Sequence, residues 1–334
     1  MHVDSLDNVR VGSLEPVLEG DIIASLNTPF FEINGVGYYS PPVSFDQLTK
    51  LMRMSPHHES ALNCKTQAVM LGFKSGGNQV ISRNELKRAV MDRWLTGNYF
   101  LRIARNRKGE VTRLYHLNAR TMRRGKEPNS YFQLRPDGSA LRFEPDEIIH
   151  GMHYAPETSI YGLPEYLGAV YSILLNRQGT LFRRKFYVNG AHMGFLLVTQ
   201  GEDIGEETAK SITEKVKETK GVGNFQSMHL HLGAEGKAEL IPVGEFAKDD
   251  FEKIKHASQA DILSAHQTPA SILAVVVGNQ LPVSNSLGHV VAVFASNVIT
   301  PVQLDMKEDI NYHLEENQWI DFTEYNPLPK PMEG

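Results

Sequence analysis

The chain has 334 residues, a length that predicts about two domains and allows a sizeable buried core. Hydrophobic residues make up 41% and charged residues 22%, which excludes a disulfide-stapled miniprotein and general disorder. Thirty-four basic and 39 acidic side chains give a net charge of -5. This balance excludes a protein that binds nucleic acid tightly over its whole surface, so any DNA contact must be local or loose.

Cysteine usage and the N-terminus set the expected compartment. Cys64 has no partner for a disulfide within the chain and fits a reducing compartment. The first ten residues, MHVDSLDNVR, lack the basic flank and apolar stretch of a signal peptide. The nearest candidate for a membrane span, Ala270 to Val277, is too short. We therefore expect synthesis in the cytosol and no membrane contact.

The N-terminal part predicts an extended arm and two surface helices. Residues 1–40 mix glycine and proline with short apolar runs, which favours an arm. Helical apolar spacing then runs from Ser44 to about Ala68 and again from Ser82 to Trp94. The second helix has a capping box, because Glu85 follows its first residue by three positions, and Gly97 lies beyond its end.

A β-rich segment with many basic residues follows. FLRIAR and VTRLYHL flank a turn at 106–109, and YFQL and LRF flank a turn at 136–138, which predicts two β-hairpins in series. The simpler interpretation of the basic residues is a solvated strand face; the alternative is a patch that binds a partner or nucleic acid. Against one acidic residue, Glu110, the basic residues are Arg102, Arg105, Arg107, Lys108, Arg113, Arg120, Arg123, Arg124 and Lys126.

Two long helices are predicted to bracket a compact insert. The first begins at Pro164, which suits a first helical turn, and ends at Asn189-Gly190. Arg183, Arg184 and Lys185 in its last turns favour a helix C-terminus whether or not they bind anything. Its apolar stripe consists of Leu167, Val170, Tyr171, Leu174 and Leu175.

The insert spans residues 191–245, and the second helix runs from about Asp249 to His266. This composition predicts a small α/β unit between the helices. Its expected elements are the strand FLLVT, a polar helix from Glu206 to Lys220, a Gly-rich turn and a strand from Leu240 to Val243. On the second helix we expect one apolar side, formed by Phe251, Ile254, Ala257 and Ile262.

The window from Ile262 to Leu304 contains no Asp, Glu, Lys or Arg. The charged fraction of the whole chain, 22%, would predict about nine charged residues there. Residues 278–288 read as a loop between an apolar helix and a longer helix that starts near His289. That helix should bend at Pro301, which removes a hydrogen bond inside it. Two explanations stay open: both helices are core, or the uncharged polar loop has a function of its own.

Motifs for chemistry are weak throughout. The Gly-rich segments at 221–226 and 233–238 fail the dinucleotide-binding and P-loop patterns. The pairs His150/His153 and His229/His231 have neither a third ligand nor the HExxH pattern of a zinc helix. No GxSxG nucleophile motif is found, and a lone cysteine is weak evidence for a thiol nucleophile. We expect no catalytic residue, no metal and no cofactor.

Three segments carry a resemblance to a known family. They are PPVSF at 41–45, GLPEYLGAVYSILLNRQGTLFRRKFYVNGAHMGF at 162–195 and KDDFEKIKHASQADILSAHQTP at 248–269. Together they resemble the portal proteins of tailed bacteriophages, most closely the P2-like (PBSX-type) group. The resemblance covers about residues 40 to 320 and implies an α+β fold. It also implies a ring, usually of twelve subunits, through which a terminase motor drives double-stranded DNA.

The resemblance divides the chain into named parts. It implies a mixed α/β wing, a two-helix stem, a small α/β clip, a tunnel loop and a long kinked helix. The expected boundaries are an N-terminal arm at 1–40, the wing at 41–162, stem helix 1 at 163–190, the clip at 191–247, stem helix 2 at 248–267, the tunnel loop and kinked wing helix at 268–316, and a C-terminal crown or tail at 317–334.

The resemblance also implies site residues and partners. The tunnel loop would line the DNA channel with Asn279, Gln280, Ser284, Asn285 and Ser286, and possible DNA or subunit contacts are Arg183, Arg184, Lys185, Lys253 and Lys255. Neutral side chains suit sliding, because fixed Lys or Arg would hold the phosphates. The implied partners are further copies of the chain, the terminase large subunit, the major capsid protein and scaffold, the head-completion connector and passing DNA. The implied location is the capsid portal vertex of the virion, after assembly in the host cytoplasm.

Two readings from other classes remain as alternatives. One is a hydrolase or transferase acting on a polymer, with His150, His153 and Glu147 as its site. The other is a monomeric DNA-binding module that uses the basic hairpins. A closed ring would separate the portal reading from both.

Overall fold

A computed structural model describes residues 37–188, 195–200, 228–232, 238–242, 248–273 and 284–323. The chain divides into two compact units, the first formed by residues 1–170 and 262–334 and the second by residues 171–261. Residues 1–36 of the arm predicted at 1–40, the polar helix at 206–220 and the Gly-rich turn lie outside the described residues.

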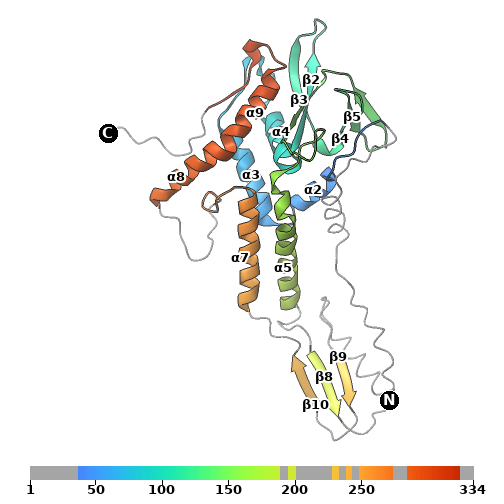
Figure 1. The fold of residues 1–334 in the computed structure, drawn as a ribbon, viewed down its shortest axis with the longest axis vertical. Helices are drawn as coiled ribbons and strands as arrows, with labels where there is room; N and C mark the ends of the chain where they lie inside the picture. Colours follow the sequence, from blue (N-terminus) through green and yellow to red (C-terminus); the bar gives the residue numbers. More distant parts are fainter. Residues whose placement is uncertain are drawn as a thin grey trace. The chain divides into compact units, whose positions relative to one another are not determined.

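Three helices form the helical layer of the first unit (Figure 1): α2 (Phe45–Met52), α3 (Pro56–Leu71) and α4 (Arg83–Thr96). The prediction of one helix over 44–68 is wrong, because Pro56 begins a new helix and Ser55 before it is extended, at φ -133° and ψ 131°. The prediction of surface helices is also wrong, since α3 and α4 both bury much of their length in the core.

Helix α4 begins and ends as its sequence predicts. The Ser82 hydroxyl accepts a hydrogen bond from the Glu85 backbone N–H at 3.2 Å. Gly97 closes the helix in the left-handed conformation, at φ +73°. A side chain there would also collide with the backbone of Leu163, so the position requires glycine twice over.

The first unit also contains two three-stranded antiparallel sheets, of which the one with β2 and β3 packs against α4, and both predicted hairpins are confirmed. Gly109 and Gly138 occupy the hairpin turns at φ +87° and +81°. Strands β4 and β7, which are short, were not predicted. The first sheet has the order β3-β2-β7, with β2 (Asn98–Arg105), β3 (Val111–Leu117) and β7 (Ile148–Met152); the second has the order β4-β5-β6, with β4 (Met122–Arg124), β5 (Tyr131–Leu134) and β6 (Ala140–Phe143).

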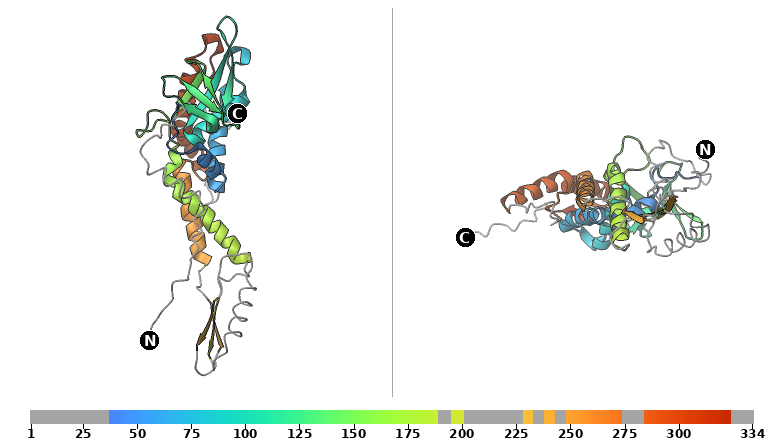
Figure 2. Two further views of the ribbon diagram at one scale, coloured as in Figure 1. Left: turned by 90° about the vertical axis from the view of Figure 1, so that its right-hand side faces the viewer. Right: turned by 90° about the horizontal axis from the view of Figure 1, so that it is seen from below.

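The two faces of the β3-β2-β7 sheet differ. Tyr99 and Leu101 are buried on the face that packs against α4 and the C-terminal helix. Phe100 and His150, paired across β2 and β7, lie on the other face, where their rings stack at 4.2 Å. Figures 1 and 2 show the C-terminal helix on one flank of the first unit and the β4-β5-β6 sheet on the other.

The C-terminal helix consists of α8 (Ser284–Phe294), a π-helical turn (Ala295–Ile299) and α9 (Thr300–Asn311). The prediction that it starts near His289 is wrong, because the helix already includes Ser284. The irregularity expected at Pro301 takes the form of the π turn just before it, since proline cannot donate to the preceding turn. The apolar helix expected at 270–277 is a turn over its described residues, where Ile272 N–H bonds Pro269 O.

The chain returns to its N-terminal half after α9. The two-residue strand β11 (Asp321–Phe322) pairs antiparallel with β1 (Phe73–Lys74), directly after α3. Thr323 N–H adds a bond to Gly72 O at 2.7 Å. Short 3₁₀ turns complete this unit: η1 (Gly77–Gln79), η2 (Ala119–Thr121), η3 (Glu165–Ala169) and η5 (Glu316–Gln318).

The second unit holds most of two helices and a small sheet. Helices α5 (Val170–Val188) and α7 (Lys248–Ala265) confirm the two long helices, although Pro164 precedes η3 as an extended residue. The sheet has the order β10-β8-β9, with β8 and β9 parallel. Strand β9, which was not predicted, contains His229 and His231. The strands are β8 (Phe195–Gln200), β9 (Met228–Leu232) and β10 (Ala238–Pro242).

Candidate functional site

A buried polar cluster joins the end of α7 to α3. His58 Nδ1 and His266 Nε2 lie 2.8 Å apart, and both side chains are fully buried. Burial, and next the positive charge of Lys65, lower the pKa of His58 to about 3; the same two causes, with His58 adding to them, lower that of His266 to about 2. Both rings are therefore neutral near pH 7 and share one proton between the facing nitrogens.

Lys65 brings a full charge into this cluster. Its ammonium forms an ion pair with Glu165 of η3, donates to His266 O at 3.4 Å and lies 3.7 Å from the Trp94 ring centroid. Burial lowers the pKa of Lys65, while the Glu165 carboxylate acts in the opposite direction. The cluster thus ties α3 both to η3 and to the end of α7.

A second cluster fixes α9 to the sheet. The buried Arg93 guanidinium pairs with Asp305 at 2.5 Å and donates to Met152 O at 3.1 Å. Tyr99 donates its hydroxyl proton to Asp309 at 2.9 Å, and burial raises the pKa of both groups. Because Gly151 lies against the Tyr99 ring and Asp309, any side chain there would displace the pair.

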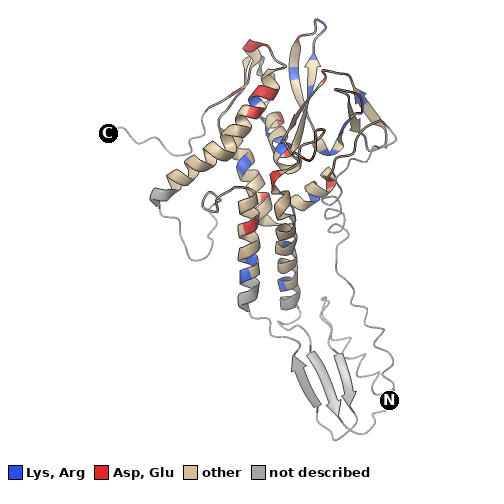
Figure 3. Ribbon diagram, viewed as in Figure 1, with Lys and Arg blue, Asp and Glu red and all other residues tan. Residues whose placement is uncertain are grey.

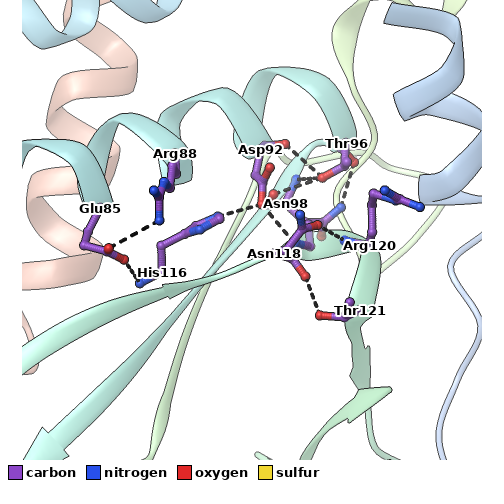
Figure 4. Close-up of polar contacts among 10 residues, drawn as sticks. Glu85, Arg88, Asp92, Thr96, Asn98, His116, Asn118, Arg120 and Thr121 are labelled. Carbon is purple, nitrogen blue, oxygen red and sulfur yellow. Dashed lines mark hydrogen bonds and ion pairs between the residues drawn. The ribbon is translucent and has the colours of Figure 1, made fainter. Parts of the chain in front are cut away.

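A third network connects α4 to β3 and η2 (Figure 4). Glu85 accepts from the His116 backbone N–H at 2.6 Å, and Asp92 faces His116 Nε2 at 2.8 Å. Asp92 also accepts from the Ala119 N–H at 2.9 Å. These carboxylates satisfy backbone donors at the outer edge of β3, so the network is a structural closure of the sheet.

The residues of the hydrolase alternative do not form a common site. His150 Nε2 faces Asn98 Oδ1 at 3.0 Å under the rings of Phe100 and Tyr161, and burial lowers its pKa to about 3. Glu147 accepts from the Glu144 N–H in a surface turn. Among the described residues, no group of three His, Cys, Asp or Glu side chains could hold a metal ion.

The helix pair of the second unit has a polar seam and an exposed apolar surface. Asn176 Nδ2 donates to the Ser258 hydroxyl at 3.0 Å, and both residues are buried. The predicted apolar stripes are therefore partly wrong: Leu174 is buried, but Tyr171 and Leu175 are about half exposed, at 57% and 49%. On α7, Ile262 is buried, whereas Ile254 and Ala257 are exposed.

The predicted contact residues lie partly on described helices. Arg183 and Arg184 are exposed on α5, and Lys253 and Lys255 are exposed on α7. The side chain of Lys185 is outside the described residues. Asn279 and Gln280 are also outside them, and Ser284, Asn285 and Ser286 belong to the first turn of α8 rather than to a loop, with side chains that are not described.

The C-terminal helix continues the charge-free window as far as Leu304 (Figure 3). By length and composition, the span Leu287–Asn311 could cross a membrane, and 39% of its most apolar window is buried in the chain. Core helices of soluble proteins pass the same test. Among the described residues, the segment that comes nearest to a membrane span in length and composition is thus this helix and not the predicted run at 270–277.

Comparison with known proteins identifies the family. The family model for phage portal proteins matches residues 74–326. The probable portal protein of Escherichia phage P2 is 34% identical over 278 residues, which cover 81% of this chain and 79% of that protein. The chain therefore belongs to the phage portal protein family, and the predicted resemblance to the P2-like group is confirmed.

Solved structures confirm the portal fold. A portal protein of the HK97 family from Corynebacterium diphtheriae gives a TM-score of 0.58 at 13% identity, covering 84% of this chain and 98% of that chain. A chain of the neck of a native gene transfer agent particle, computed with C12 symmetry, gives 0.59 at 16% identity, covering 93% and 91%. The α+β fold is thus shared with proteins of very different sequence.

The buried charged residues were missed from the sequence. Lys65 and His58 follow the helical stripe of buried residues on α3, because they are seven residues apart and one turn from Leu62 and Val69. This spacing could have indicated their burial. No local signal could have shown that His266, 208 residues away, is their partner.

Proposed function

We propose that this portal protein forms a closed ring of twelve copies at one vertex of the capsid and that the ring is the channel for double-stranded DNA. Family membership and the C12 neck of the gene transfer agent support it. The observation that carries the proposal is the exposed apolar surface of the helix pair: Tyr171, Leu175, Leu181 and Ile254 are at least 36% exposed in the single chain. A neighbouring copy would bury such a surface.

The ring is tested by its mass in solution and by negative-stain images. Sedimentation velocity of the purified chain should give a species of about twelve subunits. Negative-stain images of that species should show a central hole. Tyr171→Lys should lower the ring fraction, whereas Leu71→Lys, which changes an exposed leucine at the end of α3, should not. Monomers or dimers at every concentration and salt would contradict the ring.

The neutral polar residues of the predicted tunnel loop, of which 284–286 form the first turn of α8, are proposed to line the narrowest part of the channel. Asn279, Gln280, Ser284, Asn285 and Ser286 would touch DNA without anchoring it, because they carry no charge. Further DNA or subunit contacts are proposed at Arg183, Arg184, Lys185, Lys253 and Lys255. Twelve copies at -5 each would give a ring of about -60, which favours passage over binding.

The clip, residues 191–247, is proposed to dock the terminase large subunit during packaging and the head-completion connector afterwards. The support is its position in the chain, as an insert between two long helices. Deletion of residues 204–223 should leave the first unit folded by circular dichroism but block packaging. Heads filled normally with DNA would contradict this role.

The remaining partners and the location follow from the same proposal. The wing would contact the major capsid protein and scaffold at the portal vertex, after assembly in the host cytoplasm. ATP hydrolysis would belong to the terminase, so the purified chain should have no catalysis of its own. ATP turnover that is lost in Lys237→Ala would contradict this.

A further inference from the structure

One exposed face of the β2–β3 hairpin is basic and aromatic. The strand register pairs Arg102 with Tyr115 and Ala104 with Arg113, so both arginines lie on the same face. The Arg113 guanidinium is 5.2 Å from the Tyr115 ring, and that of Arg102 is 5.7 Å from the Phe143 ring. All but Phe143 are exposed or half-exposed, and within the described chain neither arginine forms an ion pair. We call Arg102, Arg113 and Tyr115 the basic strand face.

An acidic hollow lies where α9 meets β7. This open depression of about 260 Å³ is lined by Glu308, Asp309, Tyr312 and His313 of the C-terminal part and by Ile149 and His150 of β7. Tyr312 is 85% exposed, and Glu308 is exposed beside it. In the hollow, the carboxylate of Glu308 is exposed and that of Asp309 is bonded by Tyr99. The Tyr312 ring is exposed to solvent.

The two surfaces are opposite in charge, with two arginines on the basic strand face and two carboxylates in the hollow, and the segments that carry them have equal and opposite net charges. Residues 98–117 contain five basic residues and one acidic residue, a net charge of +4. Residues 305–316 contain five acidic residues and one basic residue, a net charge of -4. Of the basic residues in this hairpin, Arg102 and Arg113 lie on the face of the sheet opposite to Tyr99.

The two surfaces lie on opposite faces of one sheet. Tyr99, which bonds Asp309, and Arg102 are three positions apart on β2, and successive side chains on a strand point to opposite faces. The basic strand face is therefore directed to the side with β6, where Arg102 lies over Phe143, and the acidic hollow lies on the side with α9. A single chain cannot bring these surfaces together, but a head-to-tail contact between two copies can.

We propose that the basic strand face of one copy docks against the acidic hollow of the next copy, with an arginine of the face reaching the Glu308 carboxylate and Tyr312 covering the aromatic rim. This rests on the proposed ring, which needs such a heterologous contact. A second copy is favoured over DNA because DNA would use the basic face alone, and because arginines stacked on aromatic rings are typical of protein interfaces.

The test reverses each surface separately. Arg102→Glu/Arg113→Glu reverses the basic face, and Glu308→Arg reverses the exposed carboxylate of the acidic hollow. Each should lower the ring fraction about tenfold in sedimentation velocity at low salt, because like charges then face each other. An equimolar mixture of the two variants should restore rings of alternating subunits. Arg83→Glu/Lys87→Glu, the same charge change on exposed residues of α4, is the matched control and should assemble normally.

The outcomes separate this contact from the ring itself. If wild-type rings form and both reversed variants also form them, the contact is wrong and the ring stands. If the reversed variants lose assembly but the mixture does not restore it, the two surfaces are not partners. If Arg102→Glu/Arg113→Glu forms rings normally but binds a short DNA duplex more weakly, the face is a DNA surface. If the wild type forms no ring, the proposed function fails, and the contact is wrong as well unless the two variants bind each other pairwise.

Discussion

His58 Nδ1 and His266 Nε2 lie 2.8 Å apart, although 208 residues separate them in the chain. The contact is buried, neutral and shares one proton, so it depends on pH in a defined direction. It connects α3 with the residue that follows α7.

Acid should destabilise the fold through this pair. In the unfolded chain a histidine has a pKa of 6.5, and folding lowers that of His58 to about 3 and that of His266 to about 2. Their stabilising contribution is complete above pH 6.5 and is lost as the pH falls towards 3, by up to about 1.4 kcal/mol per pH unit for each group. Urea unfolding at pH 7.5, 6.5, 5.5 and 4.5 should show this fall.

Variants assign the pH dependence. His266→Gln should reduce the slope, although His150, whose pKa is also lowered to about 3, keeps part of it. His289→Gln, an exposed residue on α8, should leave it unchanged. The raised pKa of Asp309 acts with the opposite sign, because protonation of that carboxyl favours the folded state. A free energy of unfolding that is constant between pH 6.5 and 4.5 would contradict the buried pair.

The ion pair between Lys65 and Glu165 should respond unequally to loss of either partner. Glu165→Gln leaves a buried ammonium without its counterion and should cost about 3–5 kcal/mol of stability. Lys65→Met leaves Glu165, which is partly exposed, and should cost less. Glu59→Gln, which breaks the more exposed pair with Arg53, is the control and should cost below about 1 kcal/mol. Equal losses in Glu165→Gln and Glu59→Gln would show that Lys65 is hydrated.

Gly151 should tolerate no side chain. In Gly151→Ala the new methyl group would collide with the Tyr99 ring and Asp309, and repacking should cost about 1–3 kcal/mol or more. Gly168→Ala has open space around the new methyl group and is the control. Thermal unfolding of both variants measures the difference. The same melting temperature for both would mean that Tyr99 moves aside freely.

Positive charge in the tunnel loop should slow DNA. Gln280→Lys/Asn285→Lys adds about two cations per subunit, and a ring multiplies this number, so packaging should slow or stall with a steeper salt dependence. Gln280→Ser/Asn285→Gln keeps the loop neutral and polar and should package normally. Normal ring assembly with the parental packaging rate at low salt in the double-lysine variant would contradict the tunnel-loop assignment and leave the portal family unaffected.

Local signals predicted much of the fold. The Ser82 cap, Gly97, Gly109 and Gly138 each act through their own backbone, so the sequence around them is sufficient. Strand β7 is short and joins β2 from 50 residues away, and β11 has two residues; neither has a periodicity that could be read. The break at Pro56 has a local signal, the proline itself, which apolar spacing alone does not contain.

Long-range partners explain the rest of the difference. Lys65, Arg93 and His58 were predicted to lie on surface helices because charged and polar residues usually do. Their burial depends on Glu165, Asp305 and His266, which lie 100 or more residues away. The helical spacing on α3 can indicate that Lys65 and His58 are buried, but the partners that compensate a buried charge lie in no window of sequence around it.

The pairing of β1 with β11 has a consequence for how the chain is made. Residues 73–74 emerge from the ribosome early, but their partners, residues 321–322, are among the last to be synthesised. His58 of α3 and Arg93 of α4 likewise have partners that are synthesised much later, His266 and Asp305. The first unit thus cannot complete its core until residues 262–334 have been synthesised. Residues 171–261, the second unit, are all synthesised before that segment. Truncation from the C-terminus should therefore destabilise the N-terminal segment that is synthesised first. In nascent chains that stall before residue 305, Arg93 should lack its partner Asp305.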